Sequence, residues 1–76
     1  MFLEIITPDQ VLYSGEVNAV KLPGAKGSFE ILNNHAALIS SLEKGQIRVK
    51  DAQGDHLIDI TGGIVEVLKN KIIVLT

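Results

Sequence analysis

The strongest constraint on this chain is the regular alternation of apolar and polar residues in its second half. In residues 46–51, Ile47 and Val49 occupy one phase, while polar and charged residues occupy the other. Successive side chains of a strand point to opposite faces, so the pattern predicts a half-buried strand. Residues 56–61 repeat the alternation, and the polar residues 52–55 between the two runs predict a hairpin loop.

Short strands are expected along the rest of the chain as well. The remaining candidate strands are the runs 2–7, 11–13, 16–22, 28–32 and 36–44, and the hairpin 63–75 with its turn at Lys69 and Asn70. The apolar phase switches within 16–22, which predicts a kink across two sheets. Residues 36–44 fit either a strand or one and a half helical turns, and Gly45 and the short length favour the strand. We therefore expect an all-β fold, a small sandwich of about eight to ten short antiparallel strands in two sheets.

The composition indicates a thin aliphatic core. Hydrophobic residues make up 46% of the 76-residue chain, but aromatic residues only 4%. A chain of this length forms one domain, residues 1–76, and buries only about two-thirds of the surface that its unfolded form exposes. A bound partner could therefore add a large share of its stability.

The last hairpin carries more apolar surface than such a domain can hide between two sheets. Ile64, Leu68, Ile73 and Leu75 are apolar on the phase opposite to the valines of the same hairpin. If one face lies in the core, the second face needs cover. That cover comes either from within the domain, by its own loops or a closed barrel, or from another chain.

Charge and composition exclude several classes of function. The chain has 7 Lys and Arg against 9 Asp and Glu, with no basic block, so a nucleic-acid footprint is not expected. It has no cysteine, and no spacing typical of a metal site. The apolar run before Glu4 is too short for a signal peptide, and no run is long enough to span a membrane. We expect no metal, no cofactor and no membrane insertion.

Candidate catalytic residues are few. His35 could act as a general base if Ser28, Ser40 or Ser41 stood beside it, but no nucleophile motif is present. A structural or interface histidine is favoured, and His56 is expected to be exposed at a strand start. The small-hydrolase alternative thus depends on His35 alone.

Two exposed turns are candidates for binding. The turn from Pro23 to Glu30 lacks the spacing and the following helix of a phosphate loop, but exposed turns often carry contacts. Lys69, at the tip of the last hairpin, could be the modified lysine of a lipoyl or biotinyl carrier domain, which is the alternative function. Its neighbours Leu68 and Asn70 do not match the context that the modifying ligases read.

The segment PGAKGSFEILNNHAALISSLEKGQIRV, residues 23–49, resembles the epsilon subunits of F-type ATP synthases in their N-terminal β-sandwich domain. The family's G-x-[FL]-G-[IV]-L-P-G-H-A-P-L-[LI] stretch aligns with residues 27–39, and its G-G-[FI]-[VL]-E-V stretch with residues 62–67. A Tyr/Phe-Ser-Gly step matches residues 13–15, and a closing strand matches residues 71–75, so the likeness covers essentially the whole chain.

The chain departs from the family pattern at three places: Glu30 replaces glycine, Asn33 and Asn34 replace Pro-Gly, and Ala37 replaces proline. Asparagine also adopts left-handed geometry, so the turn before His35 is expected to keep its course. Many family members continue into an inhibitory, in some cases ATP-sensing, helical hairpin. We expect a short form without it, whether natural or truncated, so those properties are not transferred.

The resemblance implies a non-catalytic subunit in the central stalk of a rotary proton-translocating ATP synthase. Such a domain links the gamma subunit to the membrane c-ring and transmits torque, peripherally at the cytoplasmic face of the bacterial plasma membrane. By this resemblance, the expected gamma contacts are His35, Ile64, Leu68 and Ile73. The expected contacts with the polar loops of the c-ring are Lys26, Ser28 and Glu30.

Overall fold

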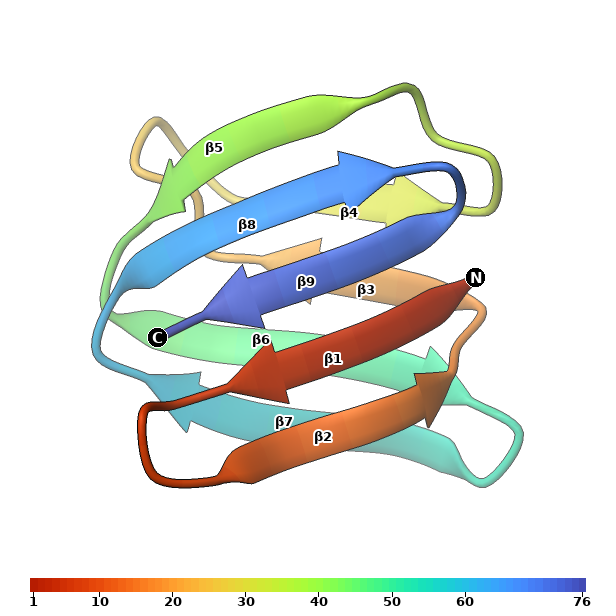
Figure 1. The fold of residues 1–76 in the computed structure, drawn as a ribbon, viewed down its shortest axis with the longest axis horizontal. Coiled ribbons are helices and arrows are strands. Elements are labelled where there is room, and N and C mark those ends of the chain that lie inside the picture. Colours follow the sequence, from red (N-terminus) through yellow and green to blue (C-terminus); the bar gives the residue numbers. More distant parts are fainter.

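The protein is a two-layer sandwich of nine strands (Figure 1). The computed structural model describes all residues, 1–76. The strands are β1 (Phe2–Ile6), β2 (Val11–Glu16), β3 (Ala19–Leu22), β4 (Phe29–Leu32), β5 (Leu38–Leu42), β6 (Gly45–Asp51), β7 (Gly54–Ile60), β8 (Gly63–Leu68) and β9 (Lys71–Leu75). The expected all-β sandwich and strand number are confirmed. The chain contains no helix of the length and apolar character that a membrane crossing requires.

Five strands form one sheet, in the order β2-β1-β9-β8-β5, and four form the other, in the order β4-β3-β6-β7. All neighbouring strands are antiparallel except β1 and β9, which run parallel (Figure 1). This pair differs from the expectation of antiparallel strands throughout. A short turn can join only antiparallel neighbours, whereas β1 and β9 are separated by most of the chain, so no local turn sets their relative direction.

The phase switch between residues 16 and 22 marks a crossing between the sheets, as expected. β2 belongs to the five-stranded sheet and β3 to the four-stranded sheet. Of the two residues between them, Val17 donates its amide to the Met1 carbonyl at 2.8 Å, and Asn18 donates to the Lys50 carbonyl at 2.7 Å. The linker is thus hydrogen-bonded toward both layers, and the apolar phase changes because the core lies on opposite sides of the two strands.

Most other local predictions are also confirmed. Residues 38–42 form strand β5, which settles the helix-or-strand ambiguity. The last hairpin turns at Lys69 and Asn70, whose φ angles of 50° and 61° are left-handed, as a tight hairpin turn requires. Asn34 has φ 62°, so asparagine does support left-handed geometry in the turn before His35. The predicted polar loop 52–55 is shorter than expected, because β6 ends at Asp51 and β7 begins at Gly54.

The core lies between the two sheets and is aliphatic, as the composition predicts. No polar or charged residue is buried. The fully buried large side chains are Leu3, Ile5, Val20, Leu22, Ile31, Ile47, Val49, Val65, Val67, Ile72 and Val74. Within β6, β8 and β9 they alternate with outward residues, so the period-two pattern correctly identifies the inner face of each of these strands.

Candidate functional site

The outer face of the five-stranded sheet carries a continuous row of apolar side chains. Strand register places Val11, Ile6, Leu75 and Ile64 side by side across β2, β1, β9 and β8. Ile64 and Leu75 are 42% and 52% exposed, respectively. Cross-strand neighbours on one face lie about 5 Å apart, so these four residues form one apolar band.

A second row on the same face combines apolar side chains with carboxylates. In register order it contains Ile39 of β5, Glu66 of β8, Ile73 of β9 and Glu4 of β1. Ile39 is 66% exposed, while Ile73 is half-buried. Glu4 lies 3.6 Å from the Lys71 ammonium group, and Glu66 forms no ion pair.

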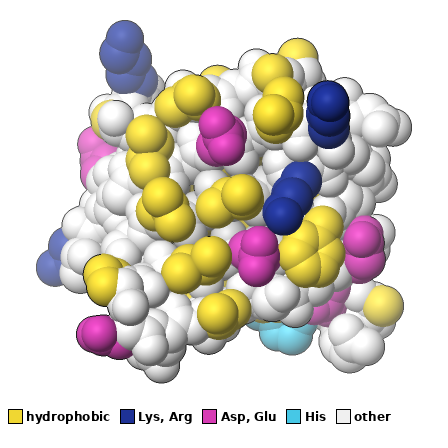
Figure 2. Space-filling model, in the orientation of Figure 1, with side chains coloured by type: hydrophobic (Ala, Val, Ile, Leu, Met, Phe, Trp, Pro, Cys, Tyr) yellow, Lys and Arg dark blue, Asp and Glu magenta, His cyan; other side chains and the backbone are white.

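We call this surface the apolar face and define it by the outward side chains of the five-stranded sheet: Ile6, Val11, Ile39, Ile64, Leu68, Ile73 and Leu75. Figure 2 views the molecule from this side and shows apolar side chains spread over it with a few charged side chains among them. Three of the predicted contact residues, Ile64, Leu68 and Ile73, lie here. The chain's own loops leave this face open, so its burial requires another molecule.

His35, the fourth predicted member of this group, lies off the sheet. It is exposed in the loop between β4 and β5, and its Nδ1 lies 2.7 Å from the carbonyl oxygen of Ala36. The preceding Asn34 donates its amide to the side-chain oxygen of Asn70 at 2.8 Å, which holds the loop against the β8–β9 turn. His35 therefore sits near the end of the apolar face where β8 turns into β9 (Figure 1).

The hydrogen bonding around His35 is not that of a nucleophile and its base. Its ring nitrogen bonds a backbone carbonyl, and the hydroxyl of Ser40 donates to the Ser41 carbonyl at 3.3 Å. Ser28 lies in the β3–β4 turn, which projects from the other end of the sandwich (Figure 1). A general base must reach the proton that it removes, and this arrangement does not provide that contact.

The β3–β4 turn holds Lys26 and Ser28 on the surface. The amide of Ala25 donates to the Ser41 carbonyl at 3.1 Å, and the amide of Glu43 donates to the Pro23 carbonyl at 2.8 Å. These bonds join the turn to the end of β5, so it has a defined position although its side chains are exposed.

Glu30 lies apart from Lys26, on the outer side of β4 opposite Lys21. Ser28 and Glu30 both line a hollow of about 340 Å³ on the four-stranded sheet, together with Ala19, Lys21, Phe29, Arg48 and Lys50. Lys26 is not among its lining residues. The structure thus brings together two of the three residues expected at the c-ring and leaves the third at the tip of the turn.

A cluster that the sequence analysis missed links the edges of the two sheets. The Tyr13 hydroxyl on β2 donates to Asp51 Oδ2 on β6 at 2.5 Å, and His56 Nε2 on β7 lies 2.9 Å from the same oxygen. His56 Nε2 meets no acceptor with the geometry of a well-directed hydrogen bond, so its approach to Asp51 is a close polar contact. His56 is half-buried, not simply exposed as expected.

This cluster shifts two pKa values. Burial, followed by the hydrogen bond to Asp51, raises the pKa of Tyr13 to about 12. The hydrogen bond from Tyr13, followed by the contact with His56, lowers the pKa of Asp51 to about 2. Because Asp51 stays ionised and Tyr13 stays protonated at neutral pH, the cluster is a stable acceptor–donor pair rather than a site poised for proton transfer. Tyr13 and Asp51 are 38 residues apart in the sequence, so no local pattern reveals that they meet.

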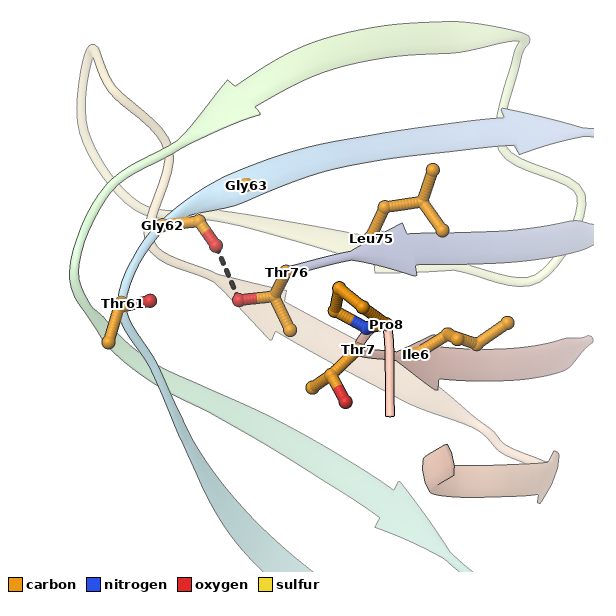
Figure 3. Close-up of a pocket in the computed structure, with 8 residues that line it drawn as sticks. All are labelled: Ile6, Thr7, Pro8, Thr61, Gly62, Gly63, Leu75 and Thr76. Atoms are coloured by element: carbon orange, nitrogen blue, oxygen red, sulfur yellow. Dashed lines mark hydrogen bonds between the residues drawn. The ribbon is translucent and has the colours of Figure 1, made fainter. Parts of the chain in front are cut away.

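The largest hollow, about 660 Å³, lies where β1 and β9 end and β8 begins (Figure 3). Its lining residues are Ile6, Thr7, Pro8, Thr61, Gly62, Gly63, Leu75 and Thr76, none of which has an ionisable side chain. The hydroxyl of Thr76 donates to the Gly62 carbonyl, and that of Thr7 accepts from the Gln10 amide. No group of three or more metal-ligating side chains occurs in the chain.

Comparison with known proteins identifies the family of this sandwich. The model of the family described as "ATP synthase, Delta/Epsilon chain, beta-sandwich domain" matches residues 1–76. The chain belongs to this family. The resemblance noted in the sequence is therefore confirmed over its full length, and the carrier-domain alternative at Lys69 gains no support from it.

Curated relatives carry the same designation. The chain is 49% identical over 73 residues to the ATP synthase epsilon chain of Campylobacter jejuni strain 81-176, a match that covers 95% of this chain and 57% of that protein. It is 40% identical over 75 residues to the epsilon chain of Chlorobaculum tepidum, covering 97% and 85%, respectively. The chain thus spans little more than half the length of its Campylobacter relatives.

Solved structures share the fold. The Euglena gracilis mitochondrial ATP synthase, resolved as OSCP, F1 and c-ring, contains a chain that matches with a TM-score of 0.89 at 21% identity, covering 97% of this chain and 48% of that one. A chain in the central stalk and c-ring of the Tetrahymena thermophila mitochondrial ATP synthase matches with a TM-score of 0.79 at 20% identity, covering 97% and 60%. At these identities the likeness establishes the family's β-sandwich fold.

Proposed function

We propose that this domain is a non-catalytic part of the central stalk of a rotary proton-translocating ATP synthase. It links the gamma subunit to the membrane c-ring and transmits torque for ATP synthesis. It works at the cytoplasmic face of the bacterial plasma membrane, as a peripheral component of the complex. Its family membership, and the epsilon-chain designation of its relatives, support this assignment.

The observation that carries the proposal is the open apolar face. Four of its members, Ile39, Ile64, Leu68 and Leu75, are large aliphatic residues with between 42% and 66% of their surface exposed. A small domain that works alone gains nothing from such a surface and risks aggregation, whereas a subunit of an assembly buries it. The apolar face is therefore assigned to the gamma subunit, with Ile64, Leu68 and Ile73 as contacts and His35 at its edge.

The c-ring contact is assigned to the β3–β4 turn and the adjoining hollow, through Lys26, Ser28 and Glu30. These side chains are exposed and polar, and they suit the polar loops of a c-ring better than an apolar partner. The turn lies at one end of the sandwich, beside the last residues of β5, whereas the apolar face covers the flank of the five-stranded sheet (Figure 1). Both partners can thus bind at the same time.

Torque transmission needs a stiff body between the two contacts. The core contains only tightly packed aliphatic side chains, and such interiors have low compressibility. The backbone of the turn is hydrogen-bonded to the end of β5, an edge strand of the sheet that carries the apolar face. Force applied to the turn therefore passes directly into that sheet.

The test is capture of the protein by a purified gamma subunit. Ile64→Asp, Leu68→Asp and Ile73→Asp each place a charge on the apolar face, and at least one should weaken capture by about 10-fold or more. Leu57→Asp is the control, because Leu57 is also an exposed aliphatic residue, at 55%, but lies on the four-stranded sheet. Capture that survives all three face variants in folded protein, or that is lost equally in Leu57→Asp, would refute the assignment.

The c-ring assignment is tested separately with the assembled rotor. Lys26→Glu and Glu30→Lys should weaken association of the gamma-bound domain with a detergent-solubilised c-ring while leaving gamma capture unchanged. Asp59 is an exposed carboxylate on β7, so Asp59→Lys is the charge-matched control for Glu30→Lys. If both turn variants bind the c-ring like the unmodified protein, the contact lies elsewhere.

A further inference from the structure

Glu66 occupies an unusual place in the middle of the apolar face. Its same-face neighbours across the adjacent strands are Ile39 and Ile73, and those along its own strand are Ile64 and Leu68. All four are aliphatic. A charged neighbour, Lys71, lies diagonally on β9, but its ammonium group is paired with Glu4.

The other carboxylates of this face, Glu4 and Glu16, have cationic partners, whereas Glu66 has none. Glu4 lies 3.6 Å from the Lys71 ammonium group. The remaining ion pairs of the chain join the N-terminus to Glu16 and His56 to Asp51, and no side-chain hydrogen bond involves Glu66. In the isolated domain this is inexpensive, because Glu66 is exposed and water solvates its charge.

Glu66 also separates two shallow apolar hollows. One, of about 170 Å³, is lined by Ile39, Ile64, Glu66, Ile73 and Leu75. The other, of about 360 Å³, is lined by Ala37, Leu38, Ile39, Glu66, Val67 and Leu68. Ile39 and Glu66 belong to both. A partner that lies across this face therefore meets an apolar depression, then a carboxylate, and then a second apolar depression.

We propose that the partner on the apolar face presents an arginine or lysine to Glu66, with an apolar side chain on either side of that cation to fill the two hollows. This inference rests on the proposed function, which places the gamma subunit on the face. Covering the face removes water from Glu66, and a desolvated charge without a partner costs several kcal/mol. An opposing cation removes that penalty, and arginine fits best because its planar group binds a carboxylate through two hydrogen bonds.

This charge pair would determine which partner binds and how the partner is aligned on the apolar face. It would add little to the overall affinity. Aliphatic surfaces tolerate sliding and substitution, whereas a single buried charge pair penalises every alignment that leaves either charge unpaired. Glu66 is thus a specificity-determining residue of the interface, and the surrounding isoleucines and leucines supply the buried area.

Replacing Glu66 with leucine gives the sharpest test. On an interface without a partner cation, Glu66→Leu removes a desolvation cost and tightens binding to gamma. If a cation is present, Glu66→Leu strands it against an apolar surface and weakens binding by about 10-fold or more, and Glu66→Lys weakens it by about 100-fold. Asp59→Lys, on the four-stranded sheet, should leave the affinity unchanged. Because Glu66 is exposed, both Glu66 variants should keep the thermal stability of the unmodified domain.

Salt and charge reversal complete the experiment. Affinity of the unmodified protein should fall with added salt, and that of Glu66→Leu should fall less. Changing the cognate basic residue of gamma to glutamate should restore binding to Glu66→Lys. Unchanged or tighter binding by Glu66→Leu overturns this inference alone, provided that the Ile64, Leu68 and Ile73 variants still lose capture. Failure of the unmodified domain to bind gamma overturns the proposed function as well.

Discussion

The outer faces of the two sheets are built from the same alternating strands but have opposite chemistry. On the five-stranded sheet the outward positions are largely apolar, and the charged exceptions are Glu4, Glu16, Glu66 and Lys71. On the four-stranded sheet they are mostly charged, with Lys21 beside Glu30 and Arg48, and Lys50 beside Asp55. Leu32 and Leu57 are exposed there but occupy the edge strands, separated by two strands.

The comparison teaches that one pattern can serve two purposes. The inner phase of each sheet is apolar because it forms the core, and only the outer phase distinguishes a solvated face from a docking face. An exposed leucine flanked by charges is ordinary for a soluble domain. Adjacent rows of exposed aliphatic residues are not, and they indicate an interface.

The largest expected effect is on the free energy of unfolding. It tests whether a glycine with a positive φ is equally important in the two sheets. Gly63 begins β8 with φ 143°, and a Cβ at this position would collide with the Leu75 carbonyl oxygen and the Thr76 backbone. Gly63→Ala should lower the free energy of unfolding by about 3 kcal/mol or more, because strain and collision add together.

Gly54→Ala is the matched control on the four-stranded sheet. Gly54 also has a positive φ, 122°, but an added Cβ would meet no atom within 4 Å. Strain alone should cost about 1 kcal/mol. Chemical denaturation of both variants measures the difference, and equal losses would show that the contact at Gly63 is relieved by backbone adjustment.

A smaller effect should separate the outer faces in the isolated domain. The apolar face should promote self-association at high protein concentration, because unpaired aliphatic surface has no other cover. Leu68→Lys should reduce this association several-fold, whereas Leu57→Lys should change it little. Sedimentation over a concentration series checks the prediction. An equal response to both substitutions would contradict the distinction between the faces.

The cluster of Tyr13, Asp51 and His56 should have a smaller effect than the apolar face, and this effect is on thermal stability. Tyr13→Phe removes the hydroxyl that donates to Asp51 and thereby disconnects the edge of the five-stranded sheet from the other layer. We expect the melting temperature at pH 7 to fall by about 5 °C. Ser14→Ala, on the opposite face of the same strand, is a control that should leave it nearly unchanged.

The smallest effect is a pH dependence of the same cluster. The pKa of Asp51 falls from 3.8 to about 2 on folding, so its contribution to stability is complete above pH 4 and is lost as the pH falls toward 2. The pKa of Tyr13 is raised from 10.0 to about 12, so its contribution is lost as the pH rises between those values. Denaturation of Tyr13→Phe should show a weaker loss in both windows. An unchanged acid profile would mean that Tyr13 does not hold the pKa of Asp51 down.

Local patterns predicted much of the fold and part of the candidate site. Alternation correctly separated Val65 and Val67, which are buried, from Ile64 and Leu68, which are exposed. The phase switch correctly predicted the crossing before β3. These succeed because side-chain direction in a strand depends only on position along the chain.

Contacts between distant segments were not predictable in this way. No spacing rule connects Tyr13 with Asp51, and none shows that β1 lies parallel to β9. The same limit applies to Glu66, which looks like one more polar residue of an alternating strand until Ile39 and Ile73 are placed on either side of it.

The sequence by itself determined the β class, the aliphatic core and the surplus of apolar residues in the last hairpin, because all three follow from composition and a period of two. Only the tertiary structure decided that this surplus lies open on one sheet, and that one uncompensated carboxylate stands at its centre. Strand order and register are set by pairing between segments far apart in the chain, and that pairing determines which outward residues become neighbours.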